Sequence, residues 1–446
     1  MHHPNPKECR KILEMKDKGN LDTISSLPDE LLANILSFLP TLSAVQTSIL
    51  SSRWRHLFTL TRNLSFNDRE YFGTASLAQC EERKLSFERF VYGVLALHRT
   101  SPIHKFSLKL KKTLIYDCSH LLLWTSAAIL KGVQHLDLDI VNHPNALPTC
   151  ILNCQTLTIL RIHTFGYDLS VPGVVCLPNL KTLDLHYIRF LDGDSVKRFF
   201  VGCSQLKELV VSNCQFTTDH VRVSATKLQK LDLNCCSGHV VIDAPNLANL
   251  SHVCTDFIGV DVKNLRSLIS IKLTFDSPQV QVLCDIIRGA VNARELILDC
   301  GAAKFLAVTE DNPIPTYSKL KRFELDYCYR DTWKYLMVWL ANSPQLEIII
   351  FGEGLIKMDD TEDELHPDVA LPPFSCNVKI IEVYWFGGHK QELLLLKYLL
   401  ENAGVLQKLI LYKDYTMEMQ QELLVKKELL LLPKASTNCT IELKDP

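Results

Sequence analysis

Three short stretches decide the fold of this chain: LKTLDL at residues 180–185, LKELVV at 206–211 and LQKLDL at 228–233. Each has the form L-x-x-L-x-L, and the pattern recurs, with apolar replacements, along most of the sequence. Its copies begin at residues 103, 133, 157, 180, 206, 228, 268, 293, 320, 346, 378 and 406, with a degenerate copy at 247. The starts lie about 25 residues apart on average, within the spacing of leucine-rich repeats.

Each repeat predicts a short strand followed by a return of the chain. Alternation places the second and third apolar residues of the pattern on one side of the strand and the residue between them on the other. Amphipathic segments between the strands predict helical returns at 194–203, 285–291, 333–342 and 392–404. Strands inside and helices outside predict an α/β fold, a leucine-rich-repeat solenoid shaped like a horseshoe.

The residue between the last two apolar positions of each repeat is predicted to face the concave side. These residues are Ser107, Asp137, Arg161, Asp184, Val210, Asp232, Lys272, Ile297, Glu324, Ile350, Glu382 and Ile410. Acidic residues outnumber basic ones among them, and such a surface repels a phosphate backbone, so we expect no nucleic acid there. A protein with basic and apolar features suits it better. We expect target contacts from Asp232, Lys272, Ile297, Glu324 and Ile350.

The composition indicates a soluble globular protein. The chain has 446 residues, of which 47% are hydrophobic, and its 48 basic and 50 acidic residues nearly cancel. Its longest apolar stretches are shorter than the roughly 20 residues that span a bilayer, so no membrane partner is expected. Sixteen cysteines in a chain that opens without a signal segment suggest thiols in a reducing compartment, the nucleus or the cytoplasm.

The cysteines are predicted to be structural. Cys214, Cys236 and Cys328 each fall three residues after the last apolar position of a repeat, where leucine-rich repeats take Asn or Cys. No C-x-x-C or H-E-x-x-H pattern occurs, and no phosphate-binding loop, dinucleotide-binding turn or nucleophile elbow is present. We therefore expect no metal, no cofactor and no catalysis by this chain.

Residues 23–60 have a compact helical pattern. Ser26 and Asp29 predict a capping box with Pro28 in the first helical turn, and Pro40 ends that helix. About forty residues with this much apolar surface cannot bury all of it internally, so the surplus should meet a partner. A further helix is predicted at 85–98.

The string LPDELL at 27–32, together with LP at 39–40 and SSRWR at 51–55, resembles an F-box of the plant kind. Leu42-Ser43 and Gln46 depart from the common residues, but neither change removes an apolar docking residue. The resemblance implies binding to a Skp-type adaptor. The implied adaptor-binding residues are Leu27, Pro28, Leu31, Ile35, Leu36, Leu39, Val45, Ile49, Leu50 and Trp54, although Trp54 could instead pack inside the F-box.

Residues 371–412 resemble the FBD region that follows leucine-rich repeats in many plant F-box proteins. The predicted organisation is a tail at 1–21, an F-box at 22–62, a helical linker at 63–102, the solenoid at 103–370 and an FBD-like cap at 371–446. The acidic run at 359–364 is read as a solvated loop, with a docking patch for a basic partner as its alternative.

The combined resemblance implies a substrate receptor of a Skp-cullin-F-box (SCF) ubiquitin ligase, in which the solenoid holds a target protein and other subunits carry out catalysis. Two alternatives remain open. One is a co-receptor for a hormone or an inositol phosphate, which would need a basic pocket. The other is an adaptor without ubiquitination.

Overall fold

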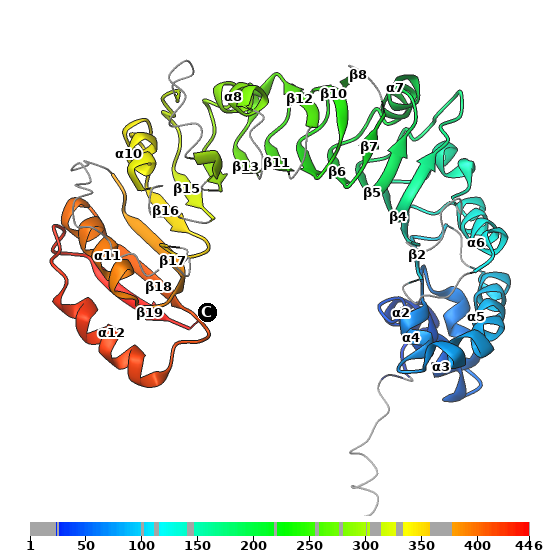
Figure 1. Cartoon of the computed structure of the whole chain (residues 1–446). Helices are drawn as coiled ribbons and strands as arrows, with labels where there is room; N and C mark the ends of the chain where they lie inside the picture. Colours follow the sequence, from blue (N-terminus) through cyan, green and yellow to red (C-terminus); the bar gives the residue numbers. More distant parts are fainter. Residues whose placement is uncertain are drawn as a thin grey trace, which may run out of the picture. The chain divides into compact units, whose positions relative to one another are not determined.

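The computed structural model describes most of the chain, in two compact units that divide after Thr164 (Figure 1). The described residues are 24, 26–99, 102–110, 116–140, 147–217, 221–254, 258–275, 280–299, 301–303, 314–326, 333–356 and 377–445. The predicted tail, the acidic run at 359–364 and Cys328 lie outside these residues.

The first unit begins with short helices in the F-box-like segment. They are α2 (Asp29–Leu36), α3 (Thr41–Gln46) and the 3₁₀ turns η2 (Thr47–Ile49) and η3 (Trp54–Leu60). Pro28 and Pro40 occupy the N-cap positions of α2 and α3, where a fixed φ and a missing N–H cost nothing. The predicted capping box is wrong: the N-cap residue of α2 is Pro28, directly before the first turn, and its side chain makes no capping hydrogen bond.

Two helices follow this cluster, α4 (Asp68–Phe72) and α5 (Leu77–Leu97). The helix predicted at 85–98 is confirmed, but it begins eight residues earlier because Ser76 and Gln79 form a capping box. Its apolar stripe, which includes Phe87 and Val91, is buried. This face fastens α5 to the rest of the first unit.

A parallel sheet runs through the first unit, with each strand paired to the next. Its strands are β1 (Asn63–Asn67), β2 (Lys105–Lys109), β3 (His135–Asp139) and β4 (Ile159–Leu169), and α6 (Cys118–Leu130) and η4 (Thr149–Asn153) connect them. The sequence reading had only helix at 63–102 and missed β1. In the repeat that contains β1, the buried Thr61 occupies the first apolar position. Because threonine is not apolar, the L-x-x-L-x-L pattern does not identify this repeat.

The second unit continues the same strand pattern. Its parallel layer follows the order β5-β6-β9-β11-β13-β14-β15-β16-β17-β18-β19, and β7 pairs with β5. The bounds are β5 (Thr182–Phe190), β6 (Glu208–Ser212), β7 (Gln215–Phe216), β9 (Lys230–Asn234), β11 (Asn249–Cys254), β13 (Ser270–Phe275), β14 (Glu295–Leu298), β15 (Arg322–Leu325), β16 (Ile348–Phe351), β17 (Ile380–Phe386), β18 (Lys408–Lys413) and β19 (Thr440–Lys444). Parallel strands in chain order confirm an α/β solenoid.

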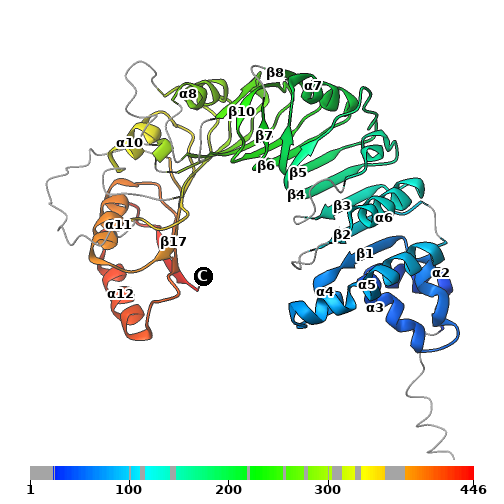
Figure 2. The same cartoon turned by 45° about the vertical axis from the view of Figure 1, so that its right-hand side comes forward.

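Helices return the chain on the outer side of this strand layer (Figure 2). They are α7 (Gly193–Gly202), α8 (Val280–Gly289), α10 (Trp333–Ala341), α11 (Lys390–Asn402) and α12 (Met419–Leu431), with a 3₁₀ turn, η5 (Leu265–Ser267). The four predicted helical returns are therefore found, with the one predicted at 285–291 beginning five residues earlier.

Helical returns do not cover every repeat. Between the strands β6 and β13 the chain returns through a second, three-stranded parallel sheet of β8 (Val221–Ser224), β10 (Gly238–Asp243) and β12 (Ile258–Lys263). The repeats here are only about 20 residues long, and a few extended residues cross the outer side with less chain than a helix of several turns requires. The expectation that helices form the outer returns is therefore wrong for the repeats between β6 and β13.

The strand phase inferred from the repeats is confirmed by the pairing. The predicted concave residues pair across neighbouring strands, as in Asp184 with Val210 and Glu324 with Ile350. The apolar positions beside them are buried, with Leu183 and Leu231 fully inaccessible to solvent. The register adds Ser251 of the degenerate repeat and Glu442 of β19 to the same row.

The two described repeat cysteines lie in the interior, as predicted. The Cys214 Sγ donates to the carbonyls of Leu185 and Ser212 and accepts from the Ile188 N–H. The Cys236 Sγ donates to the carbonyl of Val211 at 3.2 Å. Burial raises the pKa of Cys214 to about 12 and that of Cys236 to about 11, so both remain neutral thiols. Each forms hydrogen bonds with backbone groups where the chain turns after the strand.

Candidate functional site

An apolar face of α2 points to solvent in the first unit. Leu31 and Ile35 of α2 lie four residues apart and are 48% and 46% exposed, and Leu39, three residues beyond the end of the helix, is 40% exposed. Residues at this spacing share one side of a helix. The opposite side, with Leu32 and Leu36, is buried. The helix therefore presents one apolar side to its own core and another outward.

The other predicted adaptor-binding residues divide into exposed and buried groups. Ile49 and Leu50 follow α3 and are 88% and 65% exposed. Pro28 is exposed, and Leu27 and Val45 are half-buried. Trp54 packs inside the helical cluster, the alternative raised from the sequence, and Leu36 also lies in the interior. In this structure these two residues support the face and do not form its surface.

The structure adds Phe38, which the sequence reading did not select. Its side chain is 88% exposed, directly beyond the end of α2, where its N–H continues the helical turn to the Ile35 carbonyl. The sequence does show an apolar residue here, directly before the Leu39-Pro40 end of the helical segment. Phe38 lies outside the four-residue spacing of Leu31 and Ile35, so that spacing does not predict it. We define the F-box face as Leu31, Ile35, Phe38, Leu39, Ile49 and Leu50.

Arg53 ties the two ends of the F-box motif together. Its Nε donates to the Asp29 carboxylate at 2.9 Å, and its Nη2 donates to the Leu27 carbonyl. This contact joins an acidic residue of the opening string to an arginine of the closing string. It fixes the start of α2, and with it the direction of the F-box face.

The predicted target-binding residues lie in one row of the second unit. Cross-strand pairing carries the row from Asp232 through Ser251 to Lys272, and then through Ile297 and Glu324 to Ile350. All but one of the predicted residues are half-buried. Ile350 is 1% exposed, so in this structure it belongs to the interior.

Charged residues of this row form ion pairs with side chains on the same strand or two strands away. The Lys272 Nζ lies 3.7 Å from the Asp326 carboxylate, and the Arg322 guanidinium lies 3.0 Å from that of Glu324. Such ion pairs hold long side chains over the strands. The surface therefore carries both positive and negative groups instead of charge of one sign. The row thus presents fixed polar groups at the regular spacing of the strands.

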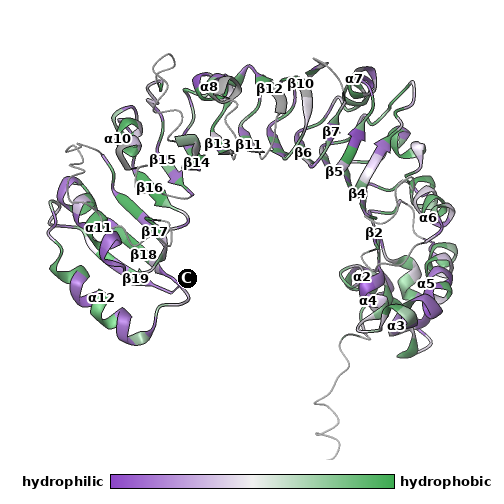
Figure 3. Ribbon diagram, in the orientation of Figure 1, coloured by the Kyte–Doolittle hydropathy of each residue, from purple (hydrophilic) through white to green (hydrophobic). Residues whose placement is uncertain are grey.

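Towards the C-terminus the strands become more apolar and aromatic. Figure 3 shows β16 to β18 as largely hydrophobic, in contrast to β5. The rings of Tyr384 and Tyr412 stack with centroids 4.4 Å apart, and the Tyr384 hydroxyl donates to the Glu382 carboxylate at 3.4 Å. Burial, with help from the Glu382 charge and from Tyr412, raises the pKa of Tyr384 to about 12.

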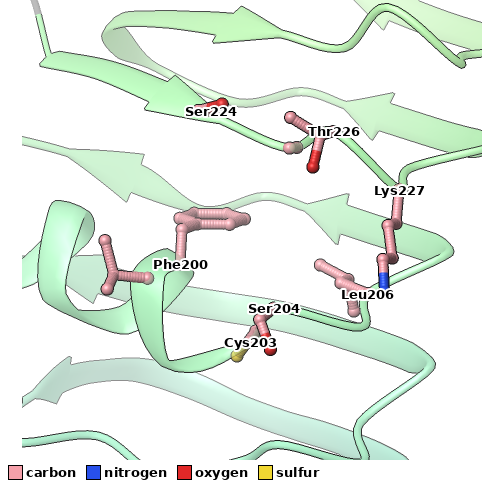
Figure 4. A pocket seen from close by; sticks show the side chains of 9 residues that line it. Phe200, Cys203, Ser204, Leu206, Ser224, Thr226 and Lys227 are labelled. Atoms are coloured by element: carbon pink, nitrogen blue, oxygen red, sulfur yellow. The ribbon is translucent and has the colours of Figure 1, made fainter.

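A small cleft lies beside the end of α7 (Figure 4). It holds about 170 Å³ between Phe200 and the turn at Ser224–Lys227. Ligand pockets of drug size usually have several hundred Å³. Its one cation, Lys227, donates to Gln205 at 2.7 Å, and no other lining residue would neutralise a phosphate.

The described residues contain no group of three or more His, Cys, Asp or Glu side chains that could hold a metal ion. Among the helices that the structure describes, none is long and apolar enough to cross a membrane.

Known families match three parts of the chain. An F-box domain model matches residues 24–66, an FBD model matches 374–411, and a model described as the LRR repeats of FBD-associated F-box protein At5g56370 matches 121–349. F-box/LRR-repeat protein At4g14103 of Arabidopsis thaliana is 32% identical over 361 residues, which cover 76% of this chain and 93% of the relative. Putative F-box/FBD/LRR-repeat protein At3g59240 of the same plant is 30% identical over 457 residues, 95% of this chain and 89% of the relative. With these matches on the motif residues and on the repeats, the chain belongs to the plant family of F-box/FBD/LRR-repeat proteins.

Proposed function

We propose that this chain is the substrate-recognition subunit of an SCF ubiquitin ligase. The F-box face carries the proposal, because six large apolar side chains stay exposed on a small helical cluster whose other side is already buried. Exposed apolar patches rimmed by polar residues mark protein-binding surfaces. In an F-box, the partner that such a face suits is a Skp-type adaptor, which joins a cullin.

The strand face of the second unit is the proposed site for the target protein. It offers a rigid array of polar and apolar side chains at the spacing of the strands. Ubiquitin transfer would belong to other subunits. The nucleus or the cytoplasm suits this role, and buried neutral thiols such as Cys214 suit a reducing compartment.

The small-molecule co-receptor has less support. A hormone or inositol phosphate needs a pocket of several hundred Å³, and an inositol phosphate also needs several cations. The cleft at α7 provides about 170 Å³ and Lys227.

Adaptor binding is tested by placing charge on the F-box face. Leu31→Asp with Ile35→Asp puts two carboxylates where the adaptor would bury apolar surface, while the buried side of α2 is unchanged. Loss of a single interface anchor costs about 2 kcal/mol or more, which corresponds to about thirtyfold, so binding of the double variant to a purified Skp-type adaptor should weaken by at least this factor in calorimetry.

The matched control is Leu123→Asp, which charges a leucine of α6 that is 58% exposed and lies outside the F-box. It should bind the adaptor like the unchanged chain. Undiminished adaptor binding by the folded double variant would overturn the proposal, as would no binding by the unchanged chain.

A further inference from the structure

Four repeats of the second unit share an unusual backbone position two residues after the last apolar residue of the L-x-x-L-x-L pattern. Each of these residues has a positive φ and is followed by a buried residue that turns into the core. The positive-φ residues are Tyr187 (57°), Asn213 (52°), Cys235 (47°) and Trp385 (53°), and the buried residues after them are Ile188, Cys214, Cys236 and Phe386. The left-handed conformation is thus a property of the repeat, because it directs the next side chain inward.

Trp385 is an unfavourable residue for this position. Asparagine tolerates a left-handed backbone, whereas bulky side chains are rare there and store strain. Asn213 and Cys235 show that the solenoid does not need a large residue at this position. The pairing of β17 with β18 also shifts between Val383 and Phe386, so Trp385 lies in a bulge. Bulges of this kind redirect a side chain and occur next to functional sites.

The strained residue points to solvent instead of filling the core. Trp385 is 49% exposed, and its ring meets that of Tyr415 edge to face, with centroids 5.2 Å apart. Tyr415 is itself 72% exposed. Strain and exposure of two large aromatic rings both oppose folding, so packing does not account for them.

The loop that carries Tyr415 is fixed against Trp385. The Asp414 N–H donates to the Phe386 carbonyl at 3.1 Å, directly beside Trp385. The Asp414 carboxylate accepts from the Thr416 N–H at 2.9 Å and so closes the turn around Tyr415. These bonds hold the backbone that carries Tyr415 next to the backbone that carries Trp385.

The loop that carries Tyr415 contains two carboxylates. Asp414 precedes Tyr415, and Glu418 follows in the same exposed loop. The nearest cation in sequence, Lys413, is bridged by Glu422 and Asp445, each at 2.7 Å. The other aromatic residue with positive φ, Tyr187, has a cation two residues later, Arg189, which pairs with Asp168.

We propose that Trp385 and Tyr415 form a docking site for a lysine or arginine side chain of the target protein. The faces of tryptophan and tyrosine attract cations, arginine most often, and the carboxylates nearby add to this attraction. The proposal rests on the proposed function in that the occupant is a target. It places an anchor at the C-terminal end of the repeats, beyond the middle row selected from the sequence.

A positional-scanning library of nine-residue peptides, each pool with one fixed central residue, tests the chemistry directly. The full chain is immobilised and the retained peptides are measured for each pool. Pools fixed as Arg or Lys should be enriched about three- to tenfold over the pool fixed as Gln. Trp385→Ala and Tyr415→Ala should each remove that preference.

Phe165→Ala is the matched control, because it removes a 65% exposed ring that contacts Tyr187 in the other aromatic pair. It should leave the Arg and Lys preference unchanged. A preference for acidic or aliphatic residues, no preference, or an Arg and Lys preference that survives Trp385→Ala would overturn the proposal. Self-association that is lost in Trp385→Ala would do the same, because it would assign the rings to a second copy.

Adaptor binding is measured on the same variants and should not change. If the unchanged chain selects Arg and Lys peptides but binds no adaptor, the SCF assignment fails while the cation site stands. If it binds the adaptor and shows no such selection, only the cation site fails.

Discussion

At the scale of single residues, Glu392 gives the chain a pH dependence. This carboxyl lies buried at the start of α11 and accepts the His389 N–H at 3.0 Å. Burial raises its pKa from 4.5 to about 7. Between about pH 4.5 and 7 the folded state therefore holds more protons at this group than the unfolded state, so the free energy of unfolding falls as pH rises through that window and is level above it.

Glu392→Gln removes the charge and keeps an oxygen acceptor. At pH 8 the variant should be more stable than the unchanged chain, by about 3 kcal/mol at most, and near pH 4.5 the difference should largely disappear. Denaturant unfolding of both proteins across this pH range measures the difference. A difference that stays constant with pH would show that Glu392 is charged throughout.

At the scale of elements, the strand phase makes a sharp prediction about stability. Leu231→Asp places an unpaired charge in the core of β9, whereas Asp232→Ala changes the neighbouring half-buried residue. The first should lower the free energy of unfolding by about 4 kcal/mol or more, and the second by less than about 1 kcal/mol. Thermal melts of the two variants compare them, and equal melting temperatures would contradict the assigned phase.

The same scale shows what a repeat pattern can and cannot predict. The spacing of the repeats predicted the strands, because residues such as Leu183 and Leu231 must be buried in every repeat of a solenoid. It missed β1, where Thr61 replaces the first apolar residue, and it could not foresee the sheet of β8, β10 and β12. In those repeats the return segment is too short for a helix of several turns, so its length determines the structure. The periodicity of apolar residues carries no information about it.

The sites divide in a similar way. The F-box motif led to the exposed Leu31 and Ile35, but only three-dimensional packing separates them from the buried Leu36 and Trp54. The left-handed backbone of Trp385 has no sequence signal, because the same position in other repeats holds residues as different as Asn, Cys and Tyr.

At the scale of the whole molecule, the proposed function requires one chain to connect a ligase to a target through separate surfaces. The most direct measurement is quantitative affinity purification from plant cells treated with proteasome and neddylation inhibitors. It compares the unchanged chain, Leu31→Asp with Ile35→Asp, and Asp232→Lys with Glu324→Lys. Adaptor and cullin should be lost, by about thirtyfold or more, only from the F-box variant. Proteins that co-purify with the unchanged chain and accumulate on inhibition should be lost only from the strand-face variant. Full recovery of cullin with the F-box variant would contradict the central claim.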